Sequence, residues 1–136
     1  MKKQLAAAVL LSLVAGCSTG NDLPMARAGM TTFHQMLNAG QFDAIYANAG
    51  PDMKKASSQA DMVPLFAAVH RKLGAFQSGA VKGWWDSAST SGDYVTIQYV
   101  AKYENASVDE TFGWRIVGGH ALLARYFVTS TYLIVH

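Results

Sequence analysis

The 136-residue sequence has few of the residues on which many reactive sites depend. Cys17 is its single cysteine, so no disulfide can form within the chain. The spacing of its four histidines (His34, His70, His120 and His136) never matches the i, i+4 pattern of a helical metal site. A Gly-x-Ser-x-Gly nucleophile motif is also missing. The sequence therefore predicts no catalytic residue, no metal and no cofactor, and the histidines are expected in capping and surface roles.

Charged residues are scarce as well, at 15% of the chain. Lys2 and Lys3 account for the whole formal excess of +2, because the other nine Lys and Arg residues balance nine Asp and Glu residues. Residues 17–136 are therefore neutral and have no basic run, which gives no reason to expect nucleic-acid binding. The length and the 51% hydrophobic content are typical of one packed globular domain.

Long hydrophobic runs are missing too. The apolar run from Leu5 to Ala15 is about half of the roughly 20 residues that a membrane-spanning helix needs. It follows the basic Lys2 and Lys3 and leads into the small residues Gly16 and Cys17. This order of charge, apolar core and small residues is typical of a secretory signal peptide, so residues 1–16 are expected to be removed.

The segment Leu13-Val14-Ala15-Gly16-Cys17 resembles the lipobox of bacterial lipoproteins. This resemblance implies a diacylglyceryl thioether on Cys17, cleavage before it and acylation, for example by palmitate, of the new amine. Because Ser18 rather than Asp follows, the resemblance implies an anchor in the outer membrane, on the periplasmic face. The alternative is an ordinary signal peptide with an incidental cysteine. Residues 17–24 are expected to form a tether, followed by a single domain over residues 25–136.

The first half of that domain has a helical pattern. Apolar residues recur every three to five positions over 24–39, 42–49 and 59–73, which predicts three helices. Gly40 and Gly50-Pro51 are expected to end the first two helices. Ser58 is expected to cap the start of the third, and Gly74 its end.

The second half changes to the period of β-strands. Strands are predicted over residues 79–87, 94–103, 108–117 and 121–135, with Gly118-Gly119 as a hairpin turn. Val95, Ile97, Tyr99, Ala101 and Tyr103 are expected on one face of the second strand. Because the connections are short, the four strands should pair antiparallel. Three N-terminal helices packed on a four-stranded antiparallel sheet define an α+β domain.

This layout is similar to the nuclear transport factor 2-like (cystatin-like) superfamily. Three stretches carry the resemblance: Phe33 to Tyr46, the helix end at Leu73-Gly74, and Val95 to Tyr103 followed by Glu110 to Trp114. They look most like small bacterial lipoproteins of that superfamily with no assigned function. The resemblance covers about residues 25–134. It implies a curved sheet that wraps a long helix into a cone.

Five aromatic residues are candidates for lining a pocket in such a cone, namely Tyr46, Trp84, Tyr99, Tyr103 and Trp114. Aromatic side chains of this kind line sites for small apolar ligands, but they also fill the core of a small domain. Some members of the superfamily are enzymes with an Asp or His base inside the cone. Asp86, with nearby tyrosines, is the corresponding candidate in this sequence.

The last predicted strand is apolar on both faces, with Ala121, Leu123 and Phe127 on one and Leu122, Tyr126 and Val128 on the other. Such a strand needs cover on both faces, which a bent end of the sheet, a protein partner or a homodimer supplies. Three functions therefore stay open: a non-catalytic binding or protein-interaction module, a carrier for a small apolar ligand, and an isomerase- or dehydratase-like enzyme.

Overall fold

The computed structural model describes residues 22–136. The expected signal peptide, Cys17 and the first residues of the expected tether lie outside this range. The described chain starts with four helices: α1 (Asp22–Asn38), α2 (Phe42–Asn48), α3 (Pro51–Ala56) and α4 (Gln59–Leu73). Four strands follow, β1 (Phe76–Ser89), β2 (Gly92–Tyr103), β3 (Ser107–Val117) and β4 (His120–Thr129), and then the short helix α5 (Thr131–Val135).

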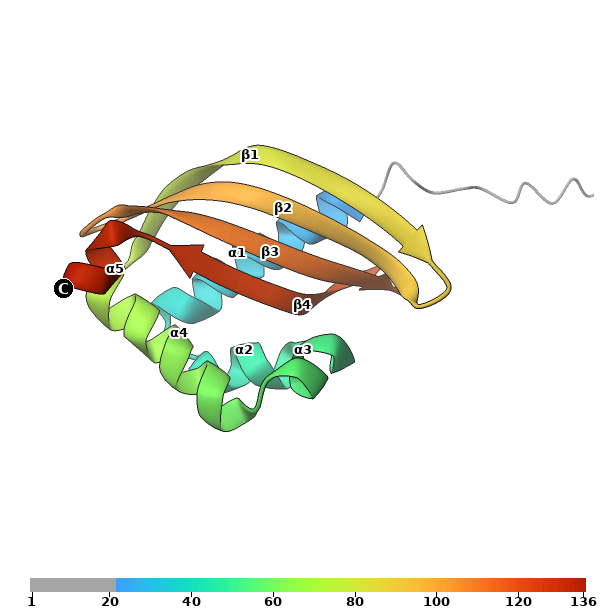
Figure 1. Cartoon of the computed structure of the whole chain (residues 1–136), viewed down its shortest axis with the longest axis horizontal. Coiled ribbons are helices and arrows are strands. Elements are labelled where there is room, and N and C mark those ends of the chain that lie inside the picture. Colours follow the sequence, from blue (N-terminus) through green and yellow to red (C-terminus); the bar gives the residue numbers. More distant parts are fainter. Residues whose placement is uncertain (1–21) are drawn as a thin grey trace, which may run out of the picture.

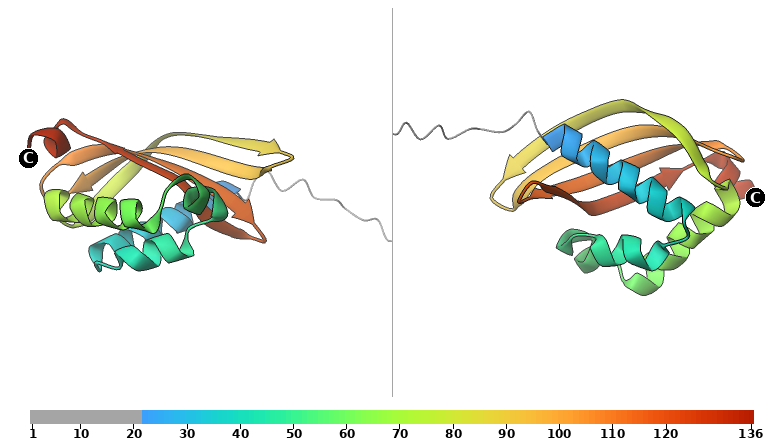
Figure 2. Two further views of the ribbon diagram at one scale, coloured as in Figure 1. Left: turned by 60° about the horizontal axis from the view of Figure 1, so that its bottom comes forward. Right: turned by 180° about the vertical axis from the view of Figure 1, so that it is seen from behind.

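The strands form one antiparallel sheet in the order β1-β2-β3-β4. The sheet is curved and arches over the first four helices (Figure 1). Helix α1 lies against the concave side and contacts all four strands, as the view from behind shows (Figure 2). The predicted α+β class and the antiparallel four-stranded sheet are confirmed. Among residues 22–136 no helix combines the length and apolar character that crossing a membrane requires.

Local signals in the sequence explain the bounds of α4, which match the prediction. Ser58 caps its start, because its hydroxyl oxygen accepts a hydrogen bond of 3.2 Å from the backbone N–H of Asp61. Gly74 follows the last turn with φ of +77°, a backbone conformation that residues with a Cβ rarely adopt. The helix thus begins and ends where the sequence predicts.

Helix α3 was missed by the sequence prediction, which took Gly50-Pro51 only as a break. Pro51 is instead the first residue of α3. Backbone N–H groups in the first turn of a helix have no acceptor within the helix, so a proline there loses no hydrogen bond. The backbone N–H of Gly50 donates to the carbonyl of Leu123 at 2.9 Å, so the start of α3 is attached to β4. The described chain therefore has five helices rather than three.

The final strand is shorter than predicted, because β4 ends at Thr129 and residues 131–135 are helical. The side chain of Ser130 accepts a hydrogen bond of 3.1 Å from the backbone N–H of Tyr132, which starts α5. Other strand bounds also shift: β1 begins at Phe76, three residues earlier than expected. Gly118 and Gly119 both have positive φ and form the predicted hairpin turn.

A β-bulge explains why β4 looks apolar on both faces. Gly113 pairs with Arg125 and Trp114 with Leu123, so Ala124 is an extra residue without a partner in β3. The extra residue reverses the alternation, and Leu123 and Tyr126 are therefore both buried although they are three positions apart. Phe127 points away from the core and is 59% exposed. The bulge removes the main reason to expect cover on both faces; a homodimer stays a prediction.

Candidate functional site

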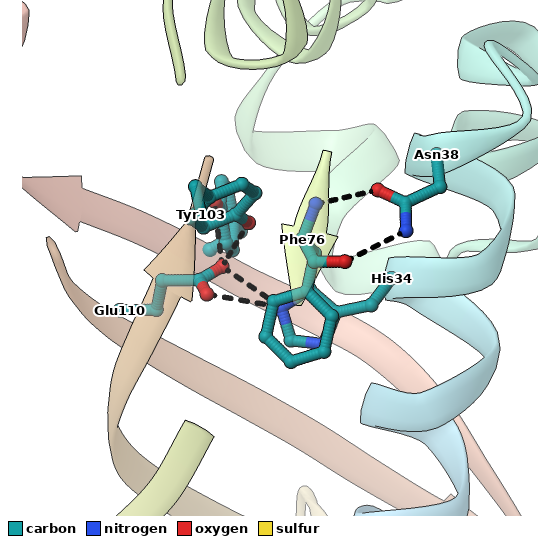
Figure 3. A network of polar contacts seen from close by, with 6 residues as sticks. His34, Asn38, Phe76, Tyr103 and Glu110 are labelled. Carbon is teal, nitrogen blue, oxygen red and sulfur yellow. Dashed lines mark hydrogen bonds and ion pairs between the residues drawn. The ribbon is translucent and has the colours of Figure 1, made fainter. Parts of the chain in front are cut away.

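A buried pair of ionisable side chains joins α1 to the middle of the sheet. His34 on α1 and Glu110 on β3 are both buried, and Glu110 has no exposed surface. His34 Nε2 lies 2.9 Å from Glu110 Oε1 and 3.3 Å from Oε2, as Figure 3 shows. Because the carboxylate accepts, this geometry assigns the ring proton to Nε2. The expectation that His34 has a capping or surface role was wrong.

Two tyrosines complete the surroundings of the carboxylate. Tyr126 donates its hydroxyl proton to Glu110 Oε2 at 2.9 Å, and Tyr103 donates to the same oxygen at 3.3 Å. Burial raises the pKa of both hydroxyls well above the ordinary value, and the nearby carboxylate of Glu110 raises them further. The tyrosines are therefore protonated donors at neutral pH. The buried carboxylate thus has three hydrogen-bond donors around it, which offset the cost of removing it from water.

An aromatic side chain also packs on the face of the His34 imidazole. The ring of Phe76 stacks on it with a centroid distance of 3.7 Å and an interplanar angle of 8°. Phe76 is fixed in turn by Asn38, whose side chain accepts from the Phe76 N–H at 2.8 Å and donates to its carbonyl at 3.1 Å (Figure 3). Phe76, the first residue of β1, thus helps to fix the orientation of the His34 ring.

The hydrogen bonds of the His34 ring all use Nε2, and the second ring nitrogen, Nδ1, makes none to the other described residues. His34 lines a hollow of about 530 Å³ between α1 and β1, here called the α1–β1 hollow. Its wall also includes Arg27, Thr31, Phe76, Val81 and Tyr99. Burial raises the pKa of Tyr99, and Glu110 adds to this. The hollow therefore offers an imidazole nitrogen, a phenol and an Arg side chain beside apolar walls.

A second hollow of about 290 Å³ lies on the other flank of α1, and is called the α1–β4 hollow. It is bounded by α1, α2 and residues of β3 and β4. Gly29 lets α1 pass close to the sheet at this place, because a Cβ there would lie 2.8 Å from Cζ3 of Trp114. Helix α1 thus has a hollow on either side.

The five aromatic residues predicted to line a pocket are distributed over the domain. Tyr99 lines the α1–β1 hollow. Tyr103 donates its hydroxyl proton to Glu110. Trp114 is buried and lines the α1–β4 hollow. Trp84 lies on edge strand β1 and is 44% exposed, and Tyr46 donates its hydroxyl proton to the carbonyl of Ser57 at 2.8 Å. The structure brings only Tyr99 and Tyr103 together.

Of the other residues considered from the sequence, Asp86 lies outside both hollows and His120 lies only at the edge of one. Asp86 pairs with Val95 across the sheet, and its side chain is exposed, so it does not act as a base inside the fold. His120 is the first residue of β4 and lies at the rim of the α1–β4 hollow. Among the described residues, no group of three or more His, Cys, Asp or Glu side chains is placed to hold a metal ion.

Glu110 was not singled out from the sequence, although a signal was present. Phe112 and Trp114 lie in the inward row of β3, and the same period of two continues back to Glu110 and Val108. A charged residue inside an inward-facing row indicates a buried polar group that needs partners. That signal identifies Glu110 but not His34, because the two residues are 76 positions apart.

We predict that Glu110→Gln lowers the free energy of unfolding by about 3 kcal/mol, because the amide group places its own donors against a histidine N–H and two hydroxyl groups. Urea unfolding monitored by circular dichroism measures this loss. Glu104→Gln is the matched control, because the exposed Glu104 accepts only the Ala75 N–H and the amide oxygen keeps that bond. Equal unfolding midpoints for the two variants would contradict the role of Glu110.

Comparisons with known proteins agree with this fold. The solution structure of a SEC-C motif containing protein from Rhodopseudomonas palustris superposes with a TM-score of 0.53 at 15% identity, covering 74% of this chain and 76% of that chain. At this identity the likeness shows the fold alone. No curated protein matches the chain in sequence. A family model described as "Protein of unknown function (DUF3887)" matches residues 31–115, which include His34 and Glu110, and the chain therefore belongs to the DUF3887 family.

Proposed function

We propose that this protein is a non-catalytic binding module whose ligand occupies the α1–β1 hollow. The observation that carries the proposal is the presence of His34 in the wall of that hollow, with Nε2 held by Glu110 and no hydrogen bond from Nδ1 to the described residues. A ring held by Glu110 on one side and by Phe76 on its face is a preorganised hydrogen-bonding group. Binding sites typically combine apolar walls with a few polar groups of this kind.

The walls indicate the class of ligand. Phe76 and Val81 present apolar surface, while Tyr99 and Arg27 add a hydroxyl group and a positive charge. The volume of about 530 Å³ lies within the usual range of small-molecule sites, roughly 300–1,000 Å³. The ligand is a small, mainly apolar molecule that carries one anionic or strongly accepting group.

The fold we propose for this module is that of the nuclear transport factor 2-like superfamily. A long helix that crosses the concave side of a curved antiparallel sheet supports this assignment (Figure 2). The hollow next to that helix is where a cone-shaped fold of this type has space for a ligand.

A lipid on Cys17 holds the module on the periplasmic face of the outer membrane in this proposal. The lipobox-like segment 13–17 supports it, and α1 begins at Asp22, only a few residues after the cysteine. Each buried methylene contributes roughly 0.8 kcal/mol, so two or three acyl chains give stable attachment where one chain does not. The binding site would then work close to a membrane surface.

Cys17→Ser tests the anchor. The serine hydroxyl does not accept the thioether lipid, so the variant should leave the membrane fraction or accumulate as an uncleaved precursor. Fractionation of cells and mass spectrometry of the intact protein measure both results. Ser18→Ala serves as the control, because it leaves the thiol in place. A processed Cys17→Ser protein that remains with membranes would refute lipid attachment.

The fluorescent probe 8-anilinonaphthalene-1-sulfonate, which joins apolar rings to an anionic sulfonate, tests the binding site. We predict saturable binding to the native protein, weakened at least roughly tenfold in Thr31→Phe, because the new ring fills the α1–β1 hollow. Thr32→Phe is the matched control, since this neighbouring exposed threonine lines the α1–β4 hollow instead. Titration by fluorescence gives the dissociation constants, and equal weakening in both variants would contradict the assignment.

A second candidate function, an isomerase-like enzyme, is favoured by the same histidine. A histidine whose Nε2 donates to a buried carboxylate has Nδ1 available as a base, for example toward a proton on carbon next to a carbonyl group. A general base contributes roughly 10²–10⁴-fold in rate. This candidate requires the substrate carbon to lie next to His34 inside the α1–β1 hollow.

Exchange of the α protons of cyclohexanone in D₂O, followed by NMR, tests this second function. If His34 is the base, the protein should accelerate exchange, and His34→Gln should reduce the acceleration at least roughly a hundredfold. His120→Gln is the control, because His120 is exposed and outside the α1–β1 hollow. Identical exchange rates with the original protein and His34→Gln would exclude His34 as the base.

A further inference from the structure

Two adjacent tryptophans of β1 are exposed at one edge of the sheet. Trp84 is 44% exposed and Trp85 is 50% exposed. Trp84 pairs with the buried Ile97 and therefore lies on the concave side of the sheet, whereas Trp85 pairs with Thr96 and lies on the convex side. Because β1 is the first strand in the sheet order, no further strand of the described chain covers this edge. The two indole rings therefore flank an open edge, one on each face.

These tryptophans lie level with the start of α1. The far end of α1 is joined to the start of β1, because Asn38 makes two hydrogen bonds with the backbone of Phe76. From this joint, the helix covers about 24 Å back to Asp22 at roughly 1.5 Å per residue, and the strand covers about 26 Å to Trp84 at roughly 3.3 Å per residue. Figure 2 shows the start of α1 and the last part of β1 at the same end of the domain.

The proposed lipid anchor brings this end of the domain close to a bilayer. Cys17 precedes Asp22 by five positions, and a chain of that length spans at most about 18 Å when fully extended. The start of α1 therefore lies within that distance of the residue that carries the lipid. Tryptophan combines an apolar ring with a polar N–H group, and proteins place it preferentially where a membrane meets water.

The charges at this end indicate which kind of lipid surface it fits. Residues 83–94 include two Asp residues but no Lys or Arg. Arg115 reaches the β1–β2 hairpin by donating to the carbonyl of Ser91 at 2.6 Å, and it is paired with Asp52 at 3.2 Å. Anionic membranes attract clusters of unpaired basic side chains, which this segment lacks. A zwitterionic headgroup layer, which asks for no positive charge, is therefore the better match.

We propose that Trp84 and Trp85 enter the zwitterionic headgroup region of the bilayer that holds the lipid on Cys17, so that this edge of the sheet faces the membrane. The inference rests on the lipid anchor proposed above and adds a second point of attachment to it. Acyl chains on a tether hold a domain at a membrane without orienting it. Two indole rings on either side of one strand fix which side of the domain faces the bilayer.

Tryptophan fluorescence of the full lipidated chain in phosphatidylcholine vesicles tests the proposal, because bromine atoms on the acyl chains quench an indole only at short range. Brominated lipid should lower the fluorescence of the original protein. The double variant Trp84→Phe, Trp85→Phe keeps only the buried Trp114 and should lose this quenching. Added salt should leave the quenching unchanged, since charge does not drive the contact. Unquenched fluorescence of the original protein, or quenching that disappears in salt, would overturn the proposal.

Phe127→Trp, added to the double variant, is the matched control. Phe127 is also exposed, at 59%, but it lies on β4 at the opposite edge of the sheet, about 14 Å away across the strands. Brominated lipid should not quench the introduced indole, and quenching as strong as in the original protein would overturn the orientation. Mass spectrometry of the same sample separates the two proposals. An unmodified Cys17 would overturn the anchor and this inference with it, whereas a lipidated chain without quenching would overturn this inference alone.

Discussion

The fully buried carboxylate of Glu110 determines how the helical layer sits on the sheet. A charge in that position is tolerated only when donors surround it, and here the donors come from α1, β2 and β4. Three elements distant in sequence must therefore reach their final places together. Removing one partner of such a buried pair destabilises a protein by far more than the intact pair stabilises it. The interaction therefore disfavours compact arrangements of the chain in which Glu110 lacks its partners.

The position of α1 follows from this network and from Gly29. His34 fixes the helix over the middle of the sheet, and Gly29 allows close approach about 1.4 turns earlier. With the helix held at these two points, space remains on both flanks. One flank offers an oriented imidazole and a positive charge, and the other is lined mainly by apolar side chains, Trp114 among them. One helix thus creates two chemically different hollows.

Much of the secondary structure could be predicted from local signals, because caps, turns and alternation act over a few residues. Ser58, Gly74 and Gly118-Gly119 mark element ends where the structure has them. The polar network could not be predicted in full. Glu110 interrupts an apolar alternation and is visible in the sequence, but its partner His34 lies in a helix whose rotation about its own axis depends on tertiary packing. The helix at Pro51 was missed because proline signals both the end of one helix and the start of the next.

The bulge at Ala124 has a consequence for how this site tolerates change. Without the unpaired residue, regular alternation would turn Tyr126 to the outer side of the sheet and leave Glu110 with one donor fewer. The chemistry of the buried carboxylate thus depends on how many residues β4 contains before Tyr126, and not only on which ones. Substitutions along the outside of this strand are compatible with the site, whereas an insertion or deletion of a single residue is not.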